Sequence, residues 1–283
     1  MNPAIETREL CYTYDDGTAA LDHVSLKAER GRITGILGAN GAGKSTLFLN
    51  LNGVLTPQSG EVLLDGVPVR RDRKGLIELR RRVGIVFQDP DDQLFSADVY
   101  RDVSFGAVNL GLPEAEVRRR VEDAMERTGV SHLRDKPTHA LSFGQKKRAA
   151  IAGVLVMEPE VLILDEPTAG LDPVGTESIL SNIRAYHKAQ NATIIMVSHS
   201  MEEMARTVDR LVVVNDGKIA LEGAPSQVFQ HGQELEDMGL GIPQMTRVFN
   251  RLKAMGVDVG SSVYTVEQAK RAILDALAKK GVG

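Results

Sequence analysis

The residues with the clearest capacity for chemistry are nine consecutive positions, three of them glycines, near the start of the chain. They read Gly38-Ala39-Asn40-Gly41-Ala42-Gly43-Lys44-Ser45-Thr46 and fit G-x-x-x-x-G-K-[ST], a loop that cradles phosphate groups. The glycines let the backbone turn tightly and leave successive N–H groups open toward phosphate oxygens. Lys44 is expected to reach the β- and γ-phosphates, and Ser45 Oγ is expected to bind Mg²⁺. The loop therefore predicts a nucleoside triphosphate site.

Two adjacent carboxylates, Asp165 and Glu166, follow the apolar run 161–164. Asp165 closes that run, so it can offer its carboxylate to Mg²⁺ while its backbone stays paired in a strand. Glu166 points elsewhere and can orient or deprotonate an attacking water, and a positioned general base contributes about 10²–10⁴-fold in rate. The alternative is a chance pair of carboxylates at a strand end.

Gln88 and His199 each stand at the end of a predicted buried strand. The amide of Gln88 can sense γ-phosphate, Mg²⁺ or water, and His199 can reach the γ-phosphate. A strand-end glutamine is also commonly structural, and a lone histidine is commonly an ordinary surface or core residue. For each of the two residues taken alone, a role at the nucleotide and an ordinary structural role both stay open.

These side chains need a framework of buried strands that end at one edge of a sheet, where open α/β sheets bind their ligands. Apolar runs predict such strands, and a helix is predicted over 45–50. The core strands are expected at 33–37, 83–87, 161–165 and 193–197, and antiparallel pieces are expected as two strands within 4–30 and as hairpins over 61–69 and 211–220. The fold class is α/β, with a mostly parallel P-loop NTPase core and an antiparallel β subdomain.

Two regions lie outside this core. Residues 96–157 are helical in pattern and predict an inserted helical subdomain, whereas the charged segment 70–82 predicts a solvated face. After Gly223 the composition changes to short helical patterns broken by Gly and Pro. We therefore expect an ATP-binding domain over residues 1–223 and a small C-terminal accessory region over 224–283.

Composition limits the partners. The 283 residues are 42% apolar and 25% charged, as is usual for a protein with a full core. The 34 basic and 38 acidic residues include no basic block, which argues against nucleic acid as the main partner. The single cysteine, Cys11, excludes a disulfide framework and suits a reducing compartment. The first residues lack the features of a signal peptide, and no apolar run approaches the roughly 18 residues of a membrane span, so any membrane role is expected to go through a partner.

Six motifs, taken together and in order, resemble those of the nucleotide-binding subunits of ABC transporters over roughly residues 4–223. They are Gly38–Thr46, Gln88, Leu141–Gln145, Asp165-Glu166, Gly170–Asp172 and His199. The segment Leu141-Ser142-Phe143-Gly144-Gln145 is similar to the family signature Leu-Ser-Gly-Gly-Gln, with Phe143 in place of a glycine. The resemblance implies a head-to-tail dimer that holds ATP between the Lys44 loop of one chain and Ser142 and Gly144 of the other.

The signature opens a predicted helix, and such an end can bind the γ-phosphate of a neighbour's ATP through Ser142 and backbone N–H groups. Phe143 keeps its backbone donor, so we expect it to limit the approach of the partner rather than to inactivate the site. Tyr14 stands where the family places an aromatic ring against adenine, whereas Tyr12 is expected in the sheet.

Within the family, segments 87–95 and 141–148 resemble energy-coupling-factor importers, most of all the cobalt/nickel type. This resemblance implies an ATP-hydrolysing motor at the cytoplasmic side of the cell membrane, working as a homodimer or with a paralogous ATPase and moving integral membrane subunits. The C-terminal extension is similar to one that helps to hold two ATPase subunits together. The cargo is expected on another polypeptide, because the six histidines show no ligand spacing.

Asp89, Asp91 and Asp92 place three carboxylates beside Gln88. They are expected either to form a solvated loop or to receive basic side chains from the membrane subunits.

Other functions stay open. The same motor serves vitamin importers and other ABC importers, and a different class comprises soluble ABC ATPases that act on nucleic acid or ribosomes. Members of that class usually carry tandem cassettes or long coiled-coil insertions, and this chain has neither. A P-loop kinase or GTPase would leave Leu141–Gln145 unexplained.

Overall fold

The larger of two sheets carries the phosphate-binding loop. The computed structural model describes residues 3–257 and 263–279, and this sheet has the strand order β11-β10-β4-β9-β8-β7. Its strands are β4 (Ile33–Leu37), β7 (Val83–Val86), β8 (Val161–Asp165), β9 (Thr193–Val197), β10 (Arg210–Asn215) and β11 (Lys218–Gly223). All neighbours pair in parallel except β10 and β11, which form an antiparallel hairpin. The predicted core strands and the closing hairpin are confirmed.

The second sheet is antiparallel and has five strands. They are β1 (Pro3–Thr13), β2 (Ala19–Val24), β3 (Lys27–Glu29), β5 (Ser59–Leu64) and β6 (Val67–Pro68). The prediction of two strands within 4–30 was incomplete, because the chain makes three. The reason is local: His23, with φ 56°, precedes a short interruption after β2, and the following β3 has only three residues. The Asp65-Gly66 turn joins β5 to β6 as expected, with positive φ at both residues.

Helices surround both sheets. They are α1 (Lys44–Leu51), α2 (Arg73–Arg82), α3 (Val99–Asn109), α4 (Glu114–Arg127), α5 (Phe143–Leu155), α6 (Pro173–Gln190), α7 (Met201–Thr207), α8 (Pro225–Val228), α9 (Gly232–Asp237), α10 (Gln244–Ala254) and α11 (Val266–Lys279). The segment 70–82 is thus largely a helix and not only a charged face. Asp72 caps α2 by accepting a hydrogen bond from the Gly75 N–H, and Leu79 anchors the helix in the core.

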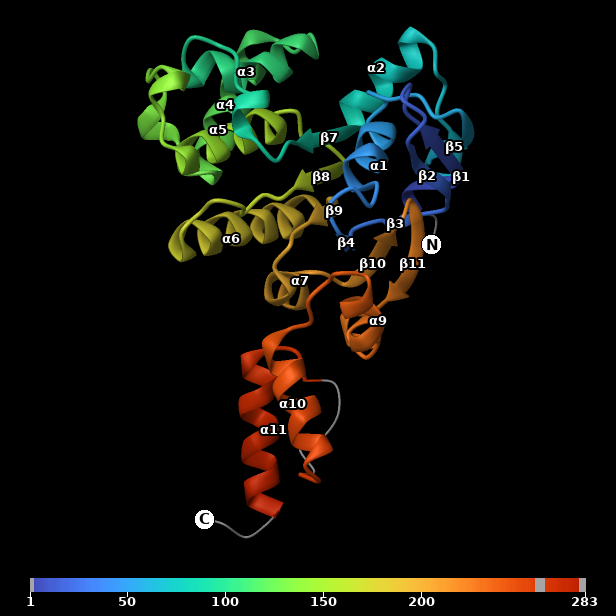
Figure 1. Cartoon of the computed structure of the whole chain (residues 1–283). Helices are drawn as coiled ribbons and strands as arrows, with labels where there is room; N and C mark the ends of the chain where they lie inside the picture. The colour runs from blue at the N-terminus through green and yellow to red at the C-terminus, as the bar shows by residue number, and fades with distance from the viewer. Residues whose placement is uncertain (1–2, 258–262, 280–283) are drawn as a thin grey trace.

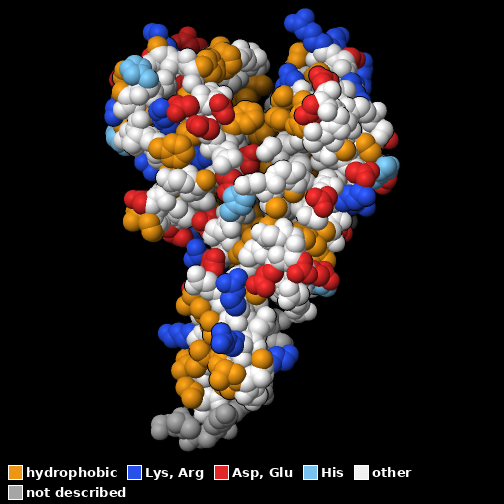
Figure 2. Space-filling model, viewed as in Figure 1, with side chains coloured by type: hydrophobic (Ala, Val, Ile, Leu, Met, Phe, Trp, Pro, Cys, Tyr) orange, Lys and Arg blue, Asp and Glu red, His pale blue; other side chains and the backbone are white. Residues whose placement is uncertain are grey.

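Two separate lobes lie above the parallel sheet in the view of Figure 1. Helices α3, α4 and α5 form one upper lobe, and the antiparallel sheet with α1 and α2 forms the other (Figure 1). The surface is hollowed between the two lobes (Figure 2). The helical lobe confirms the expected inserted subdomain in position and type.

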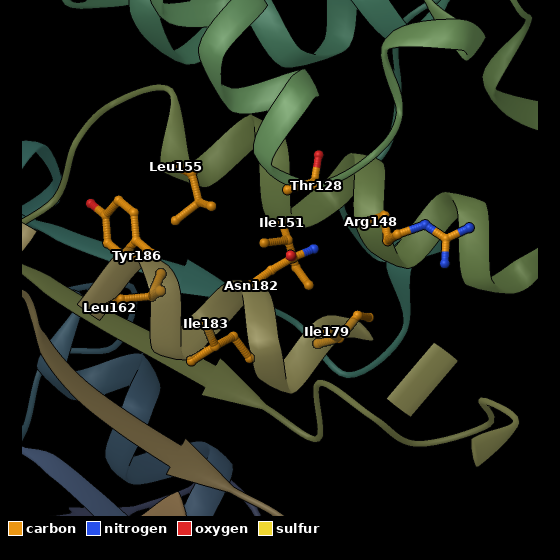
Figure 3. A pocket seen from close by; sticks show the side chains of 9 residues that line it. All are labelled: Thr128, Arg148, Ile151, Leu155, Leu162, Ile179, Asn182, Ile183 and Tyr186. Carbon is orange, nitrogen blue, oxygen red and sulfur yellow. The ribbon is translucent and has the colours of Figure 1, made fainter. Parts of the chain in front are cut away.

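The helical lobe is packed tightly against the core. A cavity of only about 10 Å³ lies where α5 and α6 meet, with Ile151 and Leu155 on one side and Ile179 and Ile183 on the other (Figure 3). A cavity of this size holds no more than about one water molecule. Tyr186 closes one end and donates its hydroxyl to the carbonyl of Pro159 at 3.2 Å. The signature helix α5 therefore packs directly against α6 of the core.

Helices α10 and α11 extend away from the sheets (Figure 1). They share a small core around Phe249, Val263 and Ala269. In the part of the chain that the structure describes, no helix combines the length and apolar character that a membrane span requires.

Candidate active site

The phosphate-binding loop joins β4 to α1, as its sequence predicts. Gly43 precedes α1 with φ 105°, and a Cβ at this position would lie 2.3 Å from the carbonyl oxygen of Ala20. A Cβ at Gly38 would lie 2.6 Å from the carbonyl oxygen of Val214. Gly41 also has a positive φ, of 80°. These three positions of the loop therefore require glycine, because a side chain there would clash with the backbone or strain it.

Lys44 lies over the loop that precedes it. Its Nζ donates to the carbonyl oxygens of Gly38 at 2.7 Å and Ala39 at 2.9 Å. Burial lowers the pKa of the Lys44 ammonium, and the charges of Glu166 and Asp165 oppose that shift. The lysine is therefore held beside the N-terminal end of α1, where a phosphate is favoured by the helix dipole.

Ser45 and Asp165 offer the oxygen ligands that Mg²⁺ prefers. Ser45 Oγ lies 3.5 Å from Asp165 Oδ2, although the two residues are far apart in the sequence. Asp165 is the last residue of β8 and pairs with Val197 of β9, so its backbone is fixed while its side chain faces the loop. The donor set fits a magnesium ion at this edge of the sheet.

Glu166 carries the most unusual carboxylate. Its φ of 47° is rare for a residue with a side chain, and its backbone N–H donates to Val197 at 3.2 Å. Its Oε2 accepts a hydrogen bond from the His199 N–H at 3.3 Å. Its buried Oε1 has no hydrogen-bond partner among the described residues, and the His199 ring Nε2 lies 3.4 Å away. This oxygen can accept a proton from a water in the cavity.

A second glutamate supports this arrangement and was missed from the sequence. Glu203 of α7 accepts hydrogen bonds from Thr168 Oγ1 at 2.7 Å and from Ser198 Oγ at 3.1 Å. One carboxylate thus joins the turn after Glu166 to the turn before His199. The sequence signal was the Ser200-x-x-Glu203 pattern, which resembles a capping box, but here only the Ser200 half caps the helix.

Tyr14 lies at the rim of the same site. Its hydroxyl is 2.9 Å from Thr46 Oγ1, and the side chain is 39% exposed, so a ring face stays accessible. Tyr12 lies in β1 and meets Tyr14 edge to face, with ring centroids 5.0 Å apart. Tyr12 therefore lies in the sheet, as its sequence context predicts, and the contact of Tyr14 with adenine stays a prediction. Thr46 is buried and its hydroxyl is taken by Tyr14, which leaves its backbone for the phosphates.

One cavity of about 320 Å³ collects most of the predicted residues. Its lining comprises Tyr14, Thr18, Ala20, Asn40, Gly41, Gly43, Lys44, Ser45, Thr46, Gln88, Asp165, Glu166 and His199. Ala42 is buried behind the loop, where its carbonyl accepts a hydrogen bond from the Gly217 N–H. Ser142, Phe143, Gly144 and Gln145 are not among the described residues that line this cavity. One chain thus brings together the loop, Gln88, both carboxylates and His199, but not the signature.

The signature segment begins α5 with a complete capping box. Ser142 Oγ accepts from the Gln145 N–H, and the Gln145 side chain accepts from the Ser142 N–H at 3.1 Å. Phe143 is 41% exposed and its ring rests on Gly170, where a Cβ would lie 2.8 Å from Phe143 Cε1. The side chain of Ser142 is exposed, so this helix end is open to another molecule.

The residues beside Gln88 have partners inside the chain. Asp89 caps a short 3-10 turn by accepting from the Asp91 N–H at 2.9 Å, and Asp91 pairs with Lys146 Nζ at 2.6 Å. Of the two alternatives for these carboxylates, docking to basic side chains of the membrane subunits stays a prediction, and Asp89 and Asp91 would have to share their internal partners to take part in it. Asp92 is exposed and remains available.

Lys147 is a further residue that sequence reasoning missed. It lies on α5 next to Lys146, yet it is completely buried and donates from Nζ to the carbonyl oxygen of Gln88 at 2.5 Å. Burial lowers the pKa of this ammonium, and Asp165, Glu166 and Asp89 oppose the shift. Its sequence context, Gln145-Lys146-Lys147-Arg148, gave no reason to separate it from its solvated neighbours.

Outside the cavity, Cys11, Asp22 and His23 bring possible metal-ligating atoms within 4.8 Å of one another. Each is already engaged: Lys218 Nζ and His23 Nδ1 lie 2.9 and 2.5 Å from the Asp22 carboxylate, and Cys11 Sγ accepts from the His23 N–H at 3.3 Å. We therefore read this cluster as an ion-paired surface turn.

The buried carboxylates predict a pH dependence. Burial raises the pKa of Glu166, an effect that His199 opposes, and burial also raises the pKa of Asp165. If Glu166 must be ionised to take a proton, activity falls as the pH drops through this raised pKa and is complete above it. The acid limb of kcat/KM, which reports the free enzyme, is therefore expected at higher pH than the value of about 4.3 for an exposed glutamate. A profile that stays flat down to that pH would contradict the assignment.

Comparison with known proteins places this site in a family. The ABC transporter family model matches residues 21–169. The energy-coupling factor transporter ATP-binding protein EcfA3 of Clostridium perfringens is 50% identical over 270 residues, 95% of each chain. The structure of cbiO1 from Clostridium perfringens, part of the ABC transporter complex cbiONQ, superposes with a TM-score of 0.76 at 50% identity, covering 89% of this chain and 100% of that one.

A bacterial ABC transporter cassette solved as a dimer gives a TM-score of 0.72 at 26% identity, over 78% of this chain and 98% of that one. The P-loop fold, the order of the motifs and these relatives agree with one another. The chain therefore belongs to the ATP-hydrolysing, ATP-binding subunits of ABC transporters, among the energy-coupling-factor ATP-binding proteins.

Proposed function

We propose that this chain is the motor subunit of an energy-coupling-factor importer, with cobalt or nickel as the cargo, and that it acts at the cytoplasmic face of the membrane. The observation that carries the motor assignment is the buried Glu166 Oε1 beside the phosphate-binding loop, which has no hydrogen-bond partner among the described residues and lies 3.4 Å from His199 Nε2. The choice of cargo rests on the resemblance of segments 87–95 and 141–148 to cobalt/nickel importers, and the relative cbiO1 is described as part of the ABC transporter complex cbiONQ.

The ATP site is assigned to residues 38–46 together with Gln88 and His199. Backbone N–H groups of the loop and Lys44 hold the phosphates, and the ring of Tyr14 takes the adenine. Ser45, Asp165 and Gln88 would hold Mg²⁺, which neutralises phosphate charge when bound. Glu166 Oε1 accepts a proton from the attacking water, and His199, whose ring is 56% exposed, holds the γ-phosphate in place.

The site is proposed to be complete only in a dimer. The cavity opens toward solvent, and the exposed Ser142 with the N–H groups at the start of α5 is a suitable second wall for a neighbour's ATP. The partner is a second copy or a paralogous ATPase. Because Glu166 and His199 are both present, a homodimer has two competent sites.

The two units proposed from the sequence fit this scheme, with residues 1–223 as the ATPase domain and residues 224–283 as a dimerisation region. Hydrophobic side chains gather over the C-terminal helices (Figure 2), and α11 exposes Val266, Ile273, Leu274 and Leu277. Such a stripe on one helix face suits a second copy of the same helix pair.

The membrane subunits are proposed to dock beside Gln88. Exposed Asp92 lies near an aromatic pair, Phe95 and Phe105, whose ring centroids are 4.7 Å apart and whose side chains are 66% and 49% exposed. An exposed carboxylate close in sequence to exposed aromatic rings suits a helix that is both basic and apolar.

Charge reversal tests this docking surface. Asp92→Lys is expected to weaken assembly with the membrane subunits about tenfold, as loss of an interfacial charge pair does, while ATP binding by the free subunit stays unchanged. Asp91→Lys is a less clean test, because it also breaks the ion pair with Lys146 and places a second positive charge beside it. Assembly and ATP affinity are measured in parallel, and equal losses in both would count against the docking role.

Cargo is tested by isolating the complex in detergent from its own membranes and identifying the proteins that accompany this chain. Reconstituted into vesicles, that complex is expected to take up radioactive cobalt or nickel with ATP and to lose this uptake with Glu166→Gln. Uptake of a vitamin in place of a metal ion would overturn the assignment of the cargo and leave the assignment as a motor subunit unchanged. If no membrane protein is isolated together with this chain, the result would favour a soluble ABC ATPase.

A further inference from the structure

Lys147 is a charged side chain that the proposed mechanism does not use. It is fully buried on α5, where an ammonium is costly unless other charges or acceptors compensate it. Among the residues that the structure describes, its hydrogen bond goes to the carbonyl oxygen of Gln88 at 2.5 Å. Gln88 lines the ATP cavity. Lys147 is not among the described residues of that lining, so it holds the backbone of Gln88 from the side of α5.

The compensating charges come from the same cavity. Burial lowers the pKa of the Lys147 ammonium, and the negative charges of Asp165, Glu166 and Asp89 oppose that shift. Asp165 and Glu166 are also the carboxylates proposed to meet magnesium and water.

Lys147 also lies close to the signature segment. Lys147 lies four residues after Phe143, hence on the same side of α5, and its Nζ is 6.0 Å from the Phe143 ring centroid. The ring rests on Gly170, whose neighbour Leu171 closes the turn that begins at Thr168. The first turns of α5 thus touch the chain's own ATP site twice, through Lys147 to Gln88 and through the signature residue Phe143 to the turn after Glu166.

We propose that Lys147 is a positioning residue that couples the ATP site of one chain to the signature segment which that chain offers to its partner's ATP. The inference rests on the proposed dimer. ATP meets Gln88 from the cavity side, while Lys147 holds the backbone of Gln88 from α5, the helix that carries Ser142 and Gly144 at its start. The two sites of the dimer are thereby linked.

The test compares Lys147→Met with Lys188→Met, a lysine on the exposed surface of α6, both in a Glu166→Gln background. ATP affinity of the dilute monomer is measured with a fluorescent ATP analogue, and ATP-driven dimerisation is measured by analytical ultracentrifugation. Lys147→Met is expected to keep ATP affinity within about twofold and to weaken dimerisation about tenfold, the size expected for loss of a charged hydrogen bond. Lys188→Met should match the parent in both.

Hydrolysis supplies a second readout that a purely structural lysine would not move. With Glu166 intact, the Hill coefficient for ATP is expected to fall from near the limit of about 2 set by two sites toward about 1 in Lys147→Met. If the methionine variant does not fold, Lys147→Gln keeps an N–H donor without the charge and is expected to show the same direction of change with a smaller size.

The outcomes separate the two levels of the proposal. Normal dimerisation and an unchanged Hill coefficient in a folded Lys147 variant would overturn the coupling role and leave the dimer standing. Loss of ATP affinity equal to the loss of dimerisation would also overturn it, because Lys147 would then act only within its own site. Failure of the Glu166→Gln parent itself to dimerise with ATP would overturn the dimer and the coupling together.

Discussion

Replacing Glu166 with glutamine is expected to lower ATP hydrolysis about 10²–10⁴-fold, the usual contribution of a general base, without abolishing ATP binding. The amide keeps the size of the side chain and can still accept the hydrogen bond from the His199 N–H. It cannot take a proton from water at Oε1, the oxygen that has no hydrogen-bond partner in the described part of the chain. The ATP-bound dimer should therefore accumulate.

The measurement is phosphate release under saturating ATP, together with the mass of the complex in solution. Glu177→Gln is a suitable control, because Glu177 is exposed on α6 and pairs with Arg184, so its loss should leave turnover unchanged. Hydrolysis at the unmutated rate in Glu166→Gln would remove this residue from its proposed role and leave the phosphate-binding loop unaffected.

Replacing Lys44 with alanine is expected to weaken ATP binding about 100-fold. Lys44 is held by two carbonyl oxygens of the loop, where it can meet the β- and γ-phosphates. Each hydrogen bond to a charged group contributes about 1.5–3 kcal/mol, and about 1.4 kcal/mol corresponds to a factor of ten. Loss of one or two such bonds therefore accounts for this change.

Nucleotide competition refines the result for Lys44. Because AMP lacks the β- and γ-phosphates, its weaker binding should change little in Lys44→Ala, whereas ATP and ADP should both lose affinity. Lys188→Ala provides the matched control on the exposed surface. A uniform loss for all three nucleotides would point to a disturbed loop and not to a lost phosphate contact.

The phosphate-binding core was predictable because each of its signals is local. The apolar run 33–37 and the glycines at 38, 41 and 43 define a strand, a loop and a helix start, and the structure has β4 and α1 within one residue of the expected limits. Strand-end positions also sufficed for Gln88, Asp165, Glu166 and His199, because parallel strands bring their carboxyl ends to one edge.

The residues that sequence reasoning missed act across distant parts of the chain. Lys147 and Lys146 are adjacent lysines, yet one is buried and the other pairs with Asp91. Both lysines contact the segment 88–92, and only the packing of α5 on the core decides that Lys147 is enclosed while Lys146 stays at the edge. Glu203 lies in a short helix, and its link between Thr168 and Ser198 depends on the alignment of β8 with β9.

The contact of Phe143 also could not be predicted from the sequence. Its departure from the family signature is visible in the sequence, but its contact with Gly170 depends on how the helical lobe sits on the core. That packing also explains why the ring is only partly exposed. The accommodation of this residue is therefore a property of the assembled fold.

The central claim is that two copies of the chain enclose each ATP. A crystal structure of Glu166→Gln with ATP and magnesium tests it most directly, through the distances from each γ-phosphate to Lys44 and to Ser142. The account predicts hydrogen-bond contact with Lys44 of one copy and with Ser142 of the other. An ATP fully enclosed by a single copy, with residues 142–145 remote from every nucleotide, would contradict it.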